Sequence, residues 1–302
     1  MKKHLLLVVI IILSACKNEK DSMKDELILW TPYNDSVEVA ANVDHEKGRM
    51  QYKLIQSKVL DKNDVFKPLY DEVSKLSKAD YEALIPMILE QNIFTIRHHI
   101  QENELTYENL VLFYLYRIYK YELNNATTLN TIIALNKDVV REARRLDEEK
   151  KLGTASQLQH PIYGMPILLK DNINTSGMKT TAGSIALTDN EVEDSFIVEE
   201  LKKNGALILG KVNLSEWAYF LCSGCPVGYS AYGGQTLNPY GRRVFETGGS
   251  SSGSGTAVAA NYAVAAVGTE TSGSILSPSS QNSVVGLKPT IGLLSRSGIV
   301  PI

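Results

Sequence analysis

Between residues 106 and 210, helical and strand patterns alternate along the chain. Thr106 precedes apolar residues at helical spacing that end near Asn124 and Asn125, as expected for a helix with a threonine N-cap. The other expected elements are a strand at 131–135, a helix at 138–150, a strand at 163–170, a helix at 195–204 that Gly205 closes, and a strand at 206–210. This alternation predicts an α/β fold with a mostly parallel or mixed sheet.

The N-terminus has the pattern of a bacterial export signal. Lys2, Lys3 and His4 precede the apolar run "LLLVVIIILSA" and Cys16. The run is too short to span ~30 Å of hydrocarbon as a helix, which disfavours a permanent membrane helix. "LSAC" resembles the lipobox of bacterial lipoproteins, which predicts a signal peptide over 1–15 and lipidation of Cys16. The protein is then expected to be exported and anchored by lipid to the cell envelope.

The rest of the chain divides into three predicted parts. A polar tether covers residues 16–27, an accessory segment covers 28–100, and the α/β core covers 101–302. Within the accessory segment, Asp71 to Lys78 has a short helical pattern. No function can be assigned to this segment from its sequence.

The charge balance gives no support for nucleic-acid binding. The formal net charge is −3, the isoelectric point is near 6.0, and the charged residues are dispersed. We therefore expect no nucleic-acid partner.

The stretch "GGSSSGSGT", residues 248–256, has several possible interpretations. A flexible linker is disfavoured because the run at 256–267 is rich in Ala and Val and is expected to be a buried helix. A phosphate-binding loop lacks the required lysine and glycine spacing. A nucleophile elbow centred on Ser251 fits G-x-S-x-G, but all five histidines precede the stretch. That interpretation requires a histidine beyond residue 302.

A buried lysine can replace histidine as the base for a serine. Burial lowers the pKa of an ammonium group, so a neutral amine can exist near pH 7. Lys170 closes the apolar strand "MPILLK" and is the candidate. A lysine at a strand end is also commonly a surface residue, so its position alone does not decide between the two roles.

Four long blocks resemble the amidase signature family of serine hydrolases. They read "GMPILLKDNINTSGMKTTAGS", "GALILGKVNLSEW", "GYSAYGGQTLNPYGRRVFETGGSSSGSGTAVAA" and "GTETSGSILSPSSQNSVVGLKPTIGLLSRSGIVPI". The resemblance runs from about Leu105 to the last residue. It implies the amidase signature fold, a mixed, mostly parallel twisted sheet covered by helices on both faces. It also implies that the chain is truncated, because family members continue well past "GIVPI".

The resemblance assigns a Ser-cisSer-Lys triad to this sequence. Ser274 matches the nucleophile, Ser250 the serine that follows a cis peptide bond, and Lys170 the base. The backbone N–H groups of Thr271, Ser272, Gly273 and Ser274 match the oxyanion hole. Ser272 stands where the family commonly has glycine.

The implied activity is hydrolysis of a carboxylic amide C–N bond through a serine acyl-enzyme. The expected partner is a small-molecule amide, and no cofactor or metal is expected. Two alternatives remain: a truncated, non-catalytic surface protein, and a histidine-based serine esterase. Glu270 matches an acidic family position and is expected to brace its loop rather than to react.

Cys222 and Cys225 form a single C-x-x-C motif. A metal site is disfavoured because no second pair completes it. A local disulfide is possible in an exported protein, but we favour two free thiols near the substrate cleft.

Overall fold

The structure is a computed structural model that describes residues 29–154, 160–221 and 224–301. Its main sheet has the strand order β1-β3-β2-β6, and the strands are β1 Ile132–Leu135, β2 Pro166–Lys170, β3 Leu207–Val212 and β6 Ala265–Val267. β2 pairs in parallel with β3 and with β6, whereas β1 is antiparallel to β3. The predicted mixed, mostly parallel sheet is therefore confirmed.

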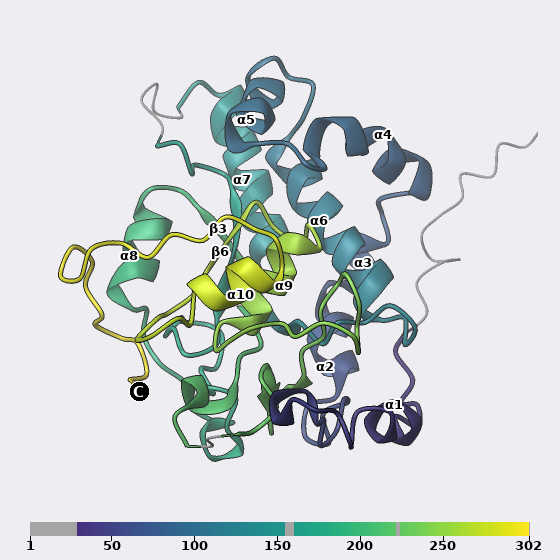
Figure 1. The fold of residues 1–302 in the computed structure, drawn as a ribbon. Helices are drawn as coiled ribbons and strands as arrows, with labels where there is room; N and C mark the ends of the chain where they lie inside the picture. The colour runs from purple at the N-terminus through teal and green to yellow at the C-terminus, as the bar shows by residue number, and fades with distance from the viewer. Residues whose placement is uncertain (1–28, 155–159, 222–223, 302) are drawn as a thin grey trace, which may run out of the picture.

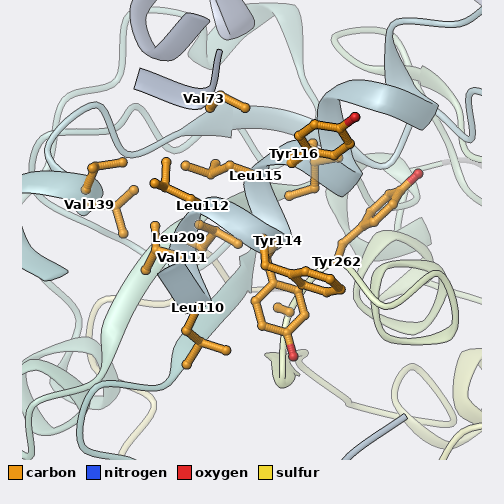
Figure 2. Close-up of a cluster of buried hydrophobic side chains, with 14 of the residues drawn as sticks. Val73, Leu110, Val111, Leu112, Tyr114, Leu115, Tyr116, Val139, Leu209 and Tyr262 are labelled. Atoms are coloured by element: carbon orange, nitrogen blue, oxygen red, sulfur yellow. The ribbon is translucent and has the colours of Figure 1, made fainter. Parts of the chain in front are cut away.

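Helices cover both faces of this sheet (Figure 1). α6 Tyr107–Glu122 and α7 Val139–Lys151 pack on one face, where Leu168 and Leu209 join the largest apolar cluster. Figure 2 shows part of that cluster, in which side chains of α6, α7 and β3 meet. α8 Phe196–Lys203 covers the other face, where Val198 contacts Ile167 and Ile208 in a second cluster. Alternate residues of β2 and β3 thus face opposite layers, as strand geometry requires.

The predicted alternation of helices and strands between residues 106 and 210 is confirmed. The Thr106 hydroxyl accepts a hydrogen bond from Asn109 N at 3.0 Å, which caps α6. Gly205 has a φ of +79° just after α8, a conformation that glycine adopts without steric cost.

Two local predictions are wrong. The helix expected at 71–78 is interrupted: α3 Tyr70–Val73 ends in a turn, and α4 Lys78–Ile88 begins after an N-cap at Ser77. The helix expected over 256–267 is instead the end of α9 Ser252–Ala259, a turn at Asn261 and strand β6. A short apolar run has no periodicity that distinguishes a buried helix from a buried strand.

Shorter elements surround the layers. The accessory segment contains α1 Ser36–Ala40, α2 Lys62–Phe66, α5 Ile93–Gln101 and the 3₁₀ turns Gly48–Met50 and Lys67–Leu69. The core adds a small ladder of β4 Tyr229–Ser230 with β5 Gly234–Gln235, the 3₁₀ turns Ile185–Leu187 and Glu216–Tyr219, and α10 Leu276–Gln281.

The predicted signal peptide over 1–15, Cys16 and most of the tether lie outside the described residues. Within the described residues, every helix is too short or too polar to cross a membrane.

Candidate active site

Lys170 is the last residue of β2 and is completely buried. Its Nζ lies 2.7 Å from Ser250 Oγ and 2.8 Å from Thr269 Oγ1. The adjacent parallel strand β6 ends at Val267, two residues before Thr269. Lys170 and Thr269 therefore meet at the carboxyl edge of the sheet, where parallel α/β sheets commonly carry their sites.

Burial lowers the pKa of Lys170 to about 7, because an ammonium group in the interior loses its hydration. The carboxylate of Glu270 acts in the opposite direction and offsets part of this effect. A substantial fraction of Lys170 is therefore a neutral amine near neutral pH.

Ser250 follows a cis peptide bond with Gly249 and is also buried. Its carbonyl oxygen accepts a hydrogen bond from Ser215 N at 3.0 Å. A Cβ on Gly249 would lie 2.7 Å from Ser215 Oγ and 2.8 Å from Val227 Cγ2. We call residues 247–251 the relay loop; its neighbours approach so closely that glycine is required at position 249.

Ser274 is mostly buried, and its backbone lies next to the relay loop. Its carbonyl oxygen accepts a hydrogen bond from Ser251 N at 3.1 Å. In the part of the chain that the structure describes, the Ser274 hydroxyl makes no hydrogen bond. The structure thus brings Lys170 into contact with Ser250, and it brings the Ser274 backbone to the same loop.

The turn before Ser274 is braced by Glu270. Its side chain is 2% exposed, and its Oε2 accepts hydrogen bonds from Ile275 N at 2.7 Å and Leu276 N at 2.9 Å. Burial raises the pKa of the Glu270 carboxyl, but hydrogen bonds from Leu276, Ile275 and Gly273 outweigh burial and hold it below its usual value. The bracing role expected for Glu270 agrees with these contacts.

The four predicted oxyanion-hole residues differ in what their N–H groups contact. The Gly273 N–H donates a hydrogen bond to the Glu270 carboxylate. The N–H groups of Thr271, Ser272 and Ser274 donate to no acceptor within the described ranges, so they remain available to a substrate oxygen.

Sequence reasoning missed two polar residues of this site. Thr269 holds Lys170 through Oγ1 and, at 3.4 Å, through its carbonyl oxygen. Asn172 Nδ2 donates to Thr269 Oγ1 at 3.1 Å. Asn172 lies just beyond the buried strand β2, and Thr269 lies just beyond the half-buried strand β6. Polar residues at strand ends were the sequence signal that could have identified them.

The nucleophile elbow centred on Ser251 has no support in the geometry. The Ser251 hydroxyl donates to Thr269 O at 3.0 Å, which ties the relay loop to the segment that follows β6. Within the described residues, no histidine hydrogen-bonds to Ser250, Ser251 or Ser274.

The expectation of free thiols is wrong for Cys225, which is disulfide-bonded. Cys222 lies outside the described residues. Across the described ranges, no group of three or more His, Cys, Asp or Glu side chains is arranged to hold a metal ion.

Comparisons with known proteins agree on one family. A model of the amidase family matches residues 109–302. A probable amidase of Arabidopsis thaliana is 47% identical over 218 residues, which are 71% of this chain and 41% of that protein. Among solved structures, an amidase family protein from Bacillus anthracis has a TM-score of 0.75 at 40% identity, covering 82% of this chain and 49% of that one.

A peptide amidase from Stenotrophomonas maltophilia has a TM-score of 0.67 at 46% identity, covering 71% of this chain and 43% of that one. The chain thus spans less than half the length of each of these three proteins.

Proposed function

Because this chain belongs to the amidase family, we propose that it hydrolyses a carboxylic amide through an acyl-enzyme on Ser274, with Ser250 as relay and Lys170 as base. One observation carries the assignment: the Lys170 Nζ to Ser250 Oγ distance of 2.7 Å between two buried side chains. A buried lysine with a pKa of about 7 is poised to exchange a proton with a hydroxyl at neutral pH.

Acylation begins with proton transfer along the triad. Neutral Lys170 takes the hydroxyl proton of Ser250, while Ser250 takes the hydroxyl proton of Ser274. The Ser274 oxygen then forms a bond to the amide carbonyl carbon. The free N–H groups of Thr271, Ser272 and Ser274 stabilise the resulting oxyanion, and each such donor contributes about 3 kcal/mol to lowering the barrier.

The intermediate collapses when the C–N bond breaks. The proton on Lys170 returns through Ser250 to the departing amine nitrogen, which leaves an ester on Ser274. Water then attacks the ester carbonyl and gives its proton through Ser250 to Lys170. Release of the carboxylic acid returns a proton to Ser274, so the triad is restored without any metal or cofactor in the proposed scheme.

A fluorophosphonate probe tests the nucleophile, because it reacts with activated serines. We expect labelling of the wild-type chain and its loss in Ser274→Ala. Ser280→Ala is the matched control, since Ser280 is an exposed serine on the nearby helix α10. Labelling that survives in Ser274→Ala would overturn the assignment of the nucleophile.

One variant and the wild type separate this scheme from the alternatives. Lys170→Ala should abolish labelling and hydrolysis, and full retention of either would favour a histidine-based esterase. A folded wild-type chain that is never labelled would favour a non-catalytic surface protein.

We further propose that the protein is exported and lipid-anchored through Cys16, and that its substrate is a small-molecule amide outside the cytoplasm. The basic start, the apolar run and "LSAC" support this location. Metabolic labelling with a fatty acid tests it, because Cys16→Ser should abolish incorporation and move the protein to the soluble fraction.

A further inference from the structure

The accessory segment makes a series of polar contacts with the chain just before the relay loop. In Figure 1 the purple ribbon of the accessory segment lies beside the green ribbon that leads to the relay loop. The contacts join residues 42–57 to residues 225–246, and they are Asn42 to Arg243, Arg49 to Val227 and Glu246, Tyr52 to Arg242, Lys53 to Cys225, Ile55 to Gln235, and Ser57 to Tyr232. The family model begins at residue 109, so it does not account for this arrangement.

Arg49 joins several parts of the active-site surroundings. Its Nη2 lies 2.9 Å from Glu246 Oε1, and its guanidinium carbon lies 5.9 Å from the centre of the Tyr219 ring. Its carbonyl oxygen accepts a hydrogen bond from Val227 N at 3.0 Å. One residue thus contacts three places on two segments.

Those two segments contact or adjoin the relay loop that carries Ser250. Glu246 immediately precedes the relay loop, and Val227 packs against Gly249, where an added Cβ would lie 2.8 Å from its Cγ2. Gly228 approaches Thr247 as closely, with 2.7 Å between an added Cβ and Thr247 Oγ1. A movement of either segment would therefore be transmitted to Ser250.

The backbone around Arg49 is itself firmly held. Met50, Tyr52 and Ile55 are buried in an apolar cluster with Leu129 and Leu237 of the core. The Arg49 side chain is 47% exposed, so its ion pair adds little to overall stability. An arginine side chain that is partly exposed on a fixed backbone is better suited to positioning the neighbouring segments than to stabilising the whole fold.

We infer that Arg49 is a positioning residue for the active site, which holds the Val227 and Glu246 segments together and so fixes the orientation of Ser250 toward Lys170. The expected effect of Arg49 on catalysis rests on the proposed function. Its expected effect on the order of the two segments rests on these contacts alone. It gives the N-terminal accessory segment a role in the active site.

Hydrogen exchange measured by mass spectrometry tests the structural part without requiring activity. In Arg49→Met we expect faster exchange in peptides covering 244–256, which lose the side-chain ion pair at Glu246, and unchanged exchange in α6, since the backbone bond from Val227 N to residue 49 remains. Arg141→Met is the matched control, because Arg141 forms a comparable exposed ion pair with Asp138 on α7 at 3.0 Å. Unchanged exchange next to Ser250, or equally faster exchange throughout the protein, would overturn the inference.

The rate of fluorophosphonate labelling tests the catalytic part. Arg49→Met should slow labelling about threefold to fivefold, and Glu246→Gln should do the same. The double variant should lose no more than Arg49→Met alone, because the ion pair that Glu246→Gln removes is already absent in Arg49→Met. Arg49→Lys should recover part of the rate by restoring the charge pair. Additive losses, or equal rates in Arg49→Met and wild type, would refute the catalytic part; an unlabelled wild type would count against the proposed function instead.

Discussion

Replacing Lys170 by methionine removes a buried amine and keeps a side chain of similar length. The pKa of Lys170 is about 7 in the folded protein and 10.5 in its ordinary environment. This difference corresponds to about 5 kcal/mol of folding free energy that the wild type loses by burying a charged amine at low pH. Methionine avoids that loss, so Lys170→Met should be inactive and yet more stable at low pH.

The sign of the pH dependence follows from proton binding. Below pH 7 both states hold the proton, so the folded wild type carries the full cost of the buried charge. Between about pH 7 and pH 10.5 the unfolded state binds more protons, so the stability of the wild type rises with pH. The advantage of Lys170→Met should therefore shrink by on the order of 3 kcal/mol between pH 6 and pH 9.

The assay is urea unfolding of the wild type and Lys170→Met at pH 6 and pH 9. Methionine also removes the hydrogen bond from Lys170 Nζ to Ser250 Oγ, at a cost of about 1–3 kcal/mol, whereas Thr269 Oγ1 keeps its bond from Asn172. That cost does not depend on pH. The difference in unfolding free energy between the two proteins therefore changes from pH 6 to pH 9 only through the titration of the Lys170 amine. Lys151→Met, at an exposed position at the end of α7, is the control and should follow the wild type at both pH values.

Parallel stability profiles for Lys170→Met and wild type would refute the reasoning. Such a result would mean that the buried amine keeps an ordinary pKa, and Lys170 would then lack the property required of the proposed base. Burial also lowers the pKa of Lys62 to about 8 and that of Lys211. Both lysines are present in both proteins, so their titration cancels in the comparison.

Three further substitutions test the structure. Thr106→Ala should lower the unfolding free energy by about 1 kcal/mol in urea titrations, because the cap of α6 is lost. Lys211→Met should cost about 3–5 kcal/mol, because it leaves Asp171 buried without its ion-pair partner at 3.1 Å, and adding Asp171→Asn should recover part of that loss. Gly253→Ala should lower the thermal midpoint and the labelling rate, because its Cβ would lie 2.3 Å from a backbone carbonyl oxygen in a packed site, and the overpacking should cost about 1–3 kcal/mol. Gly48→Ala, where a Cβ meets no atom within 4 Å, should leave both unchanged.

Local sequence determined most of the layered fold. Helix α6 and its cap, the strands β2 and β3, and the end of α8 at Gly205 were predicted from periodicity and capping residues alone. These signals act over a few residues, so a single sequence contains them in full. The same local reasoning failed at β6, which is half-buried, because a short apolar run does not distinguish a helix from a strand.

The contacts within the candidate site required the tertiary structure. Residue patterns alone did not distinguish Ser250 from Ser251, since both stand in one Gly/Ser stretch and Ser251 fits the simpler motif; the resemblance to the amidase signature family pointed to Ser250. Only the fold brings Lys170 Nζ to Ser250 Oγ across 80 residues of sequence and directs the Ser251 hydroxyl to Thr269.

The accessory segment illustrates the same division. Its residues have no catalytic motif, and their position beside the relay loop depends on contacts between residues 42–57 and 225–246. Such long-range contacts form only when the whole chain packs, because their geometry depends on every layer between them. The sequence therefore determined which elements form and that Lys170 ends a buried strand, whereas the packing of distant segments decided which serine meets it.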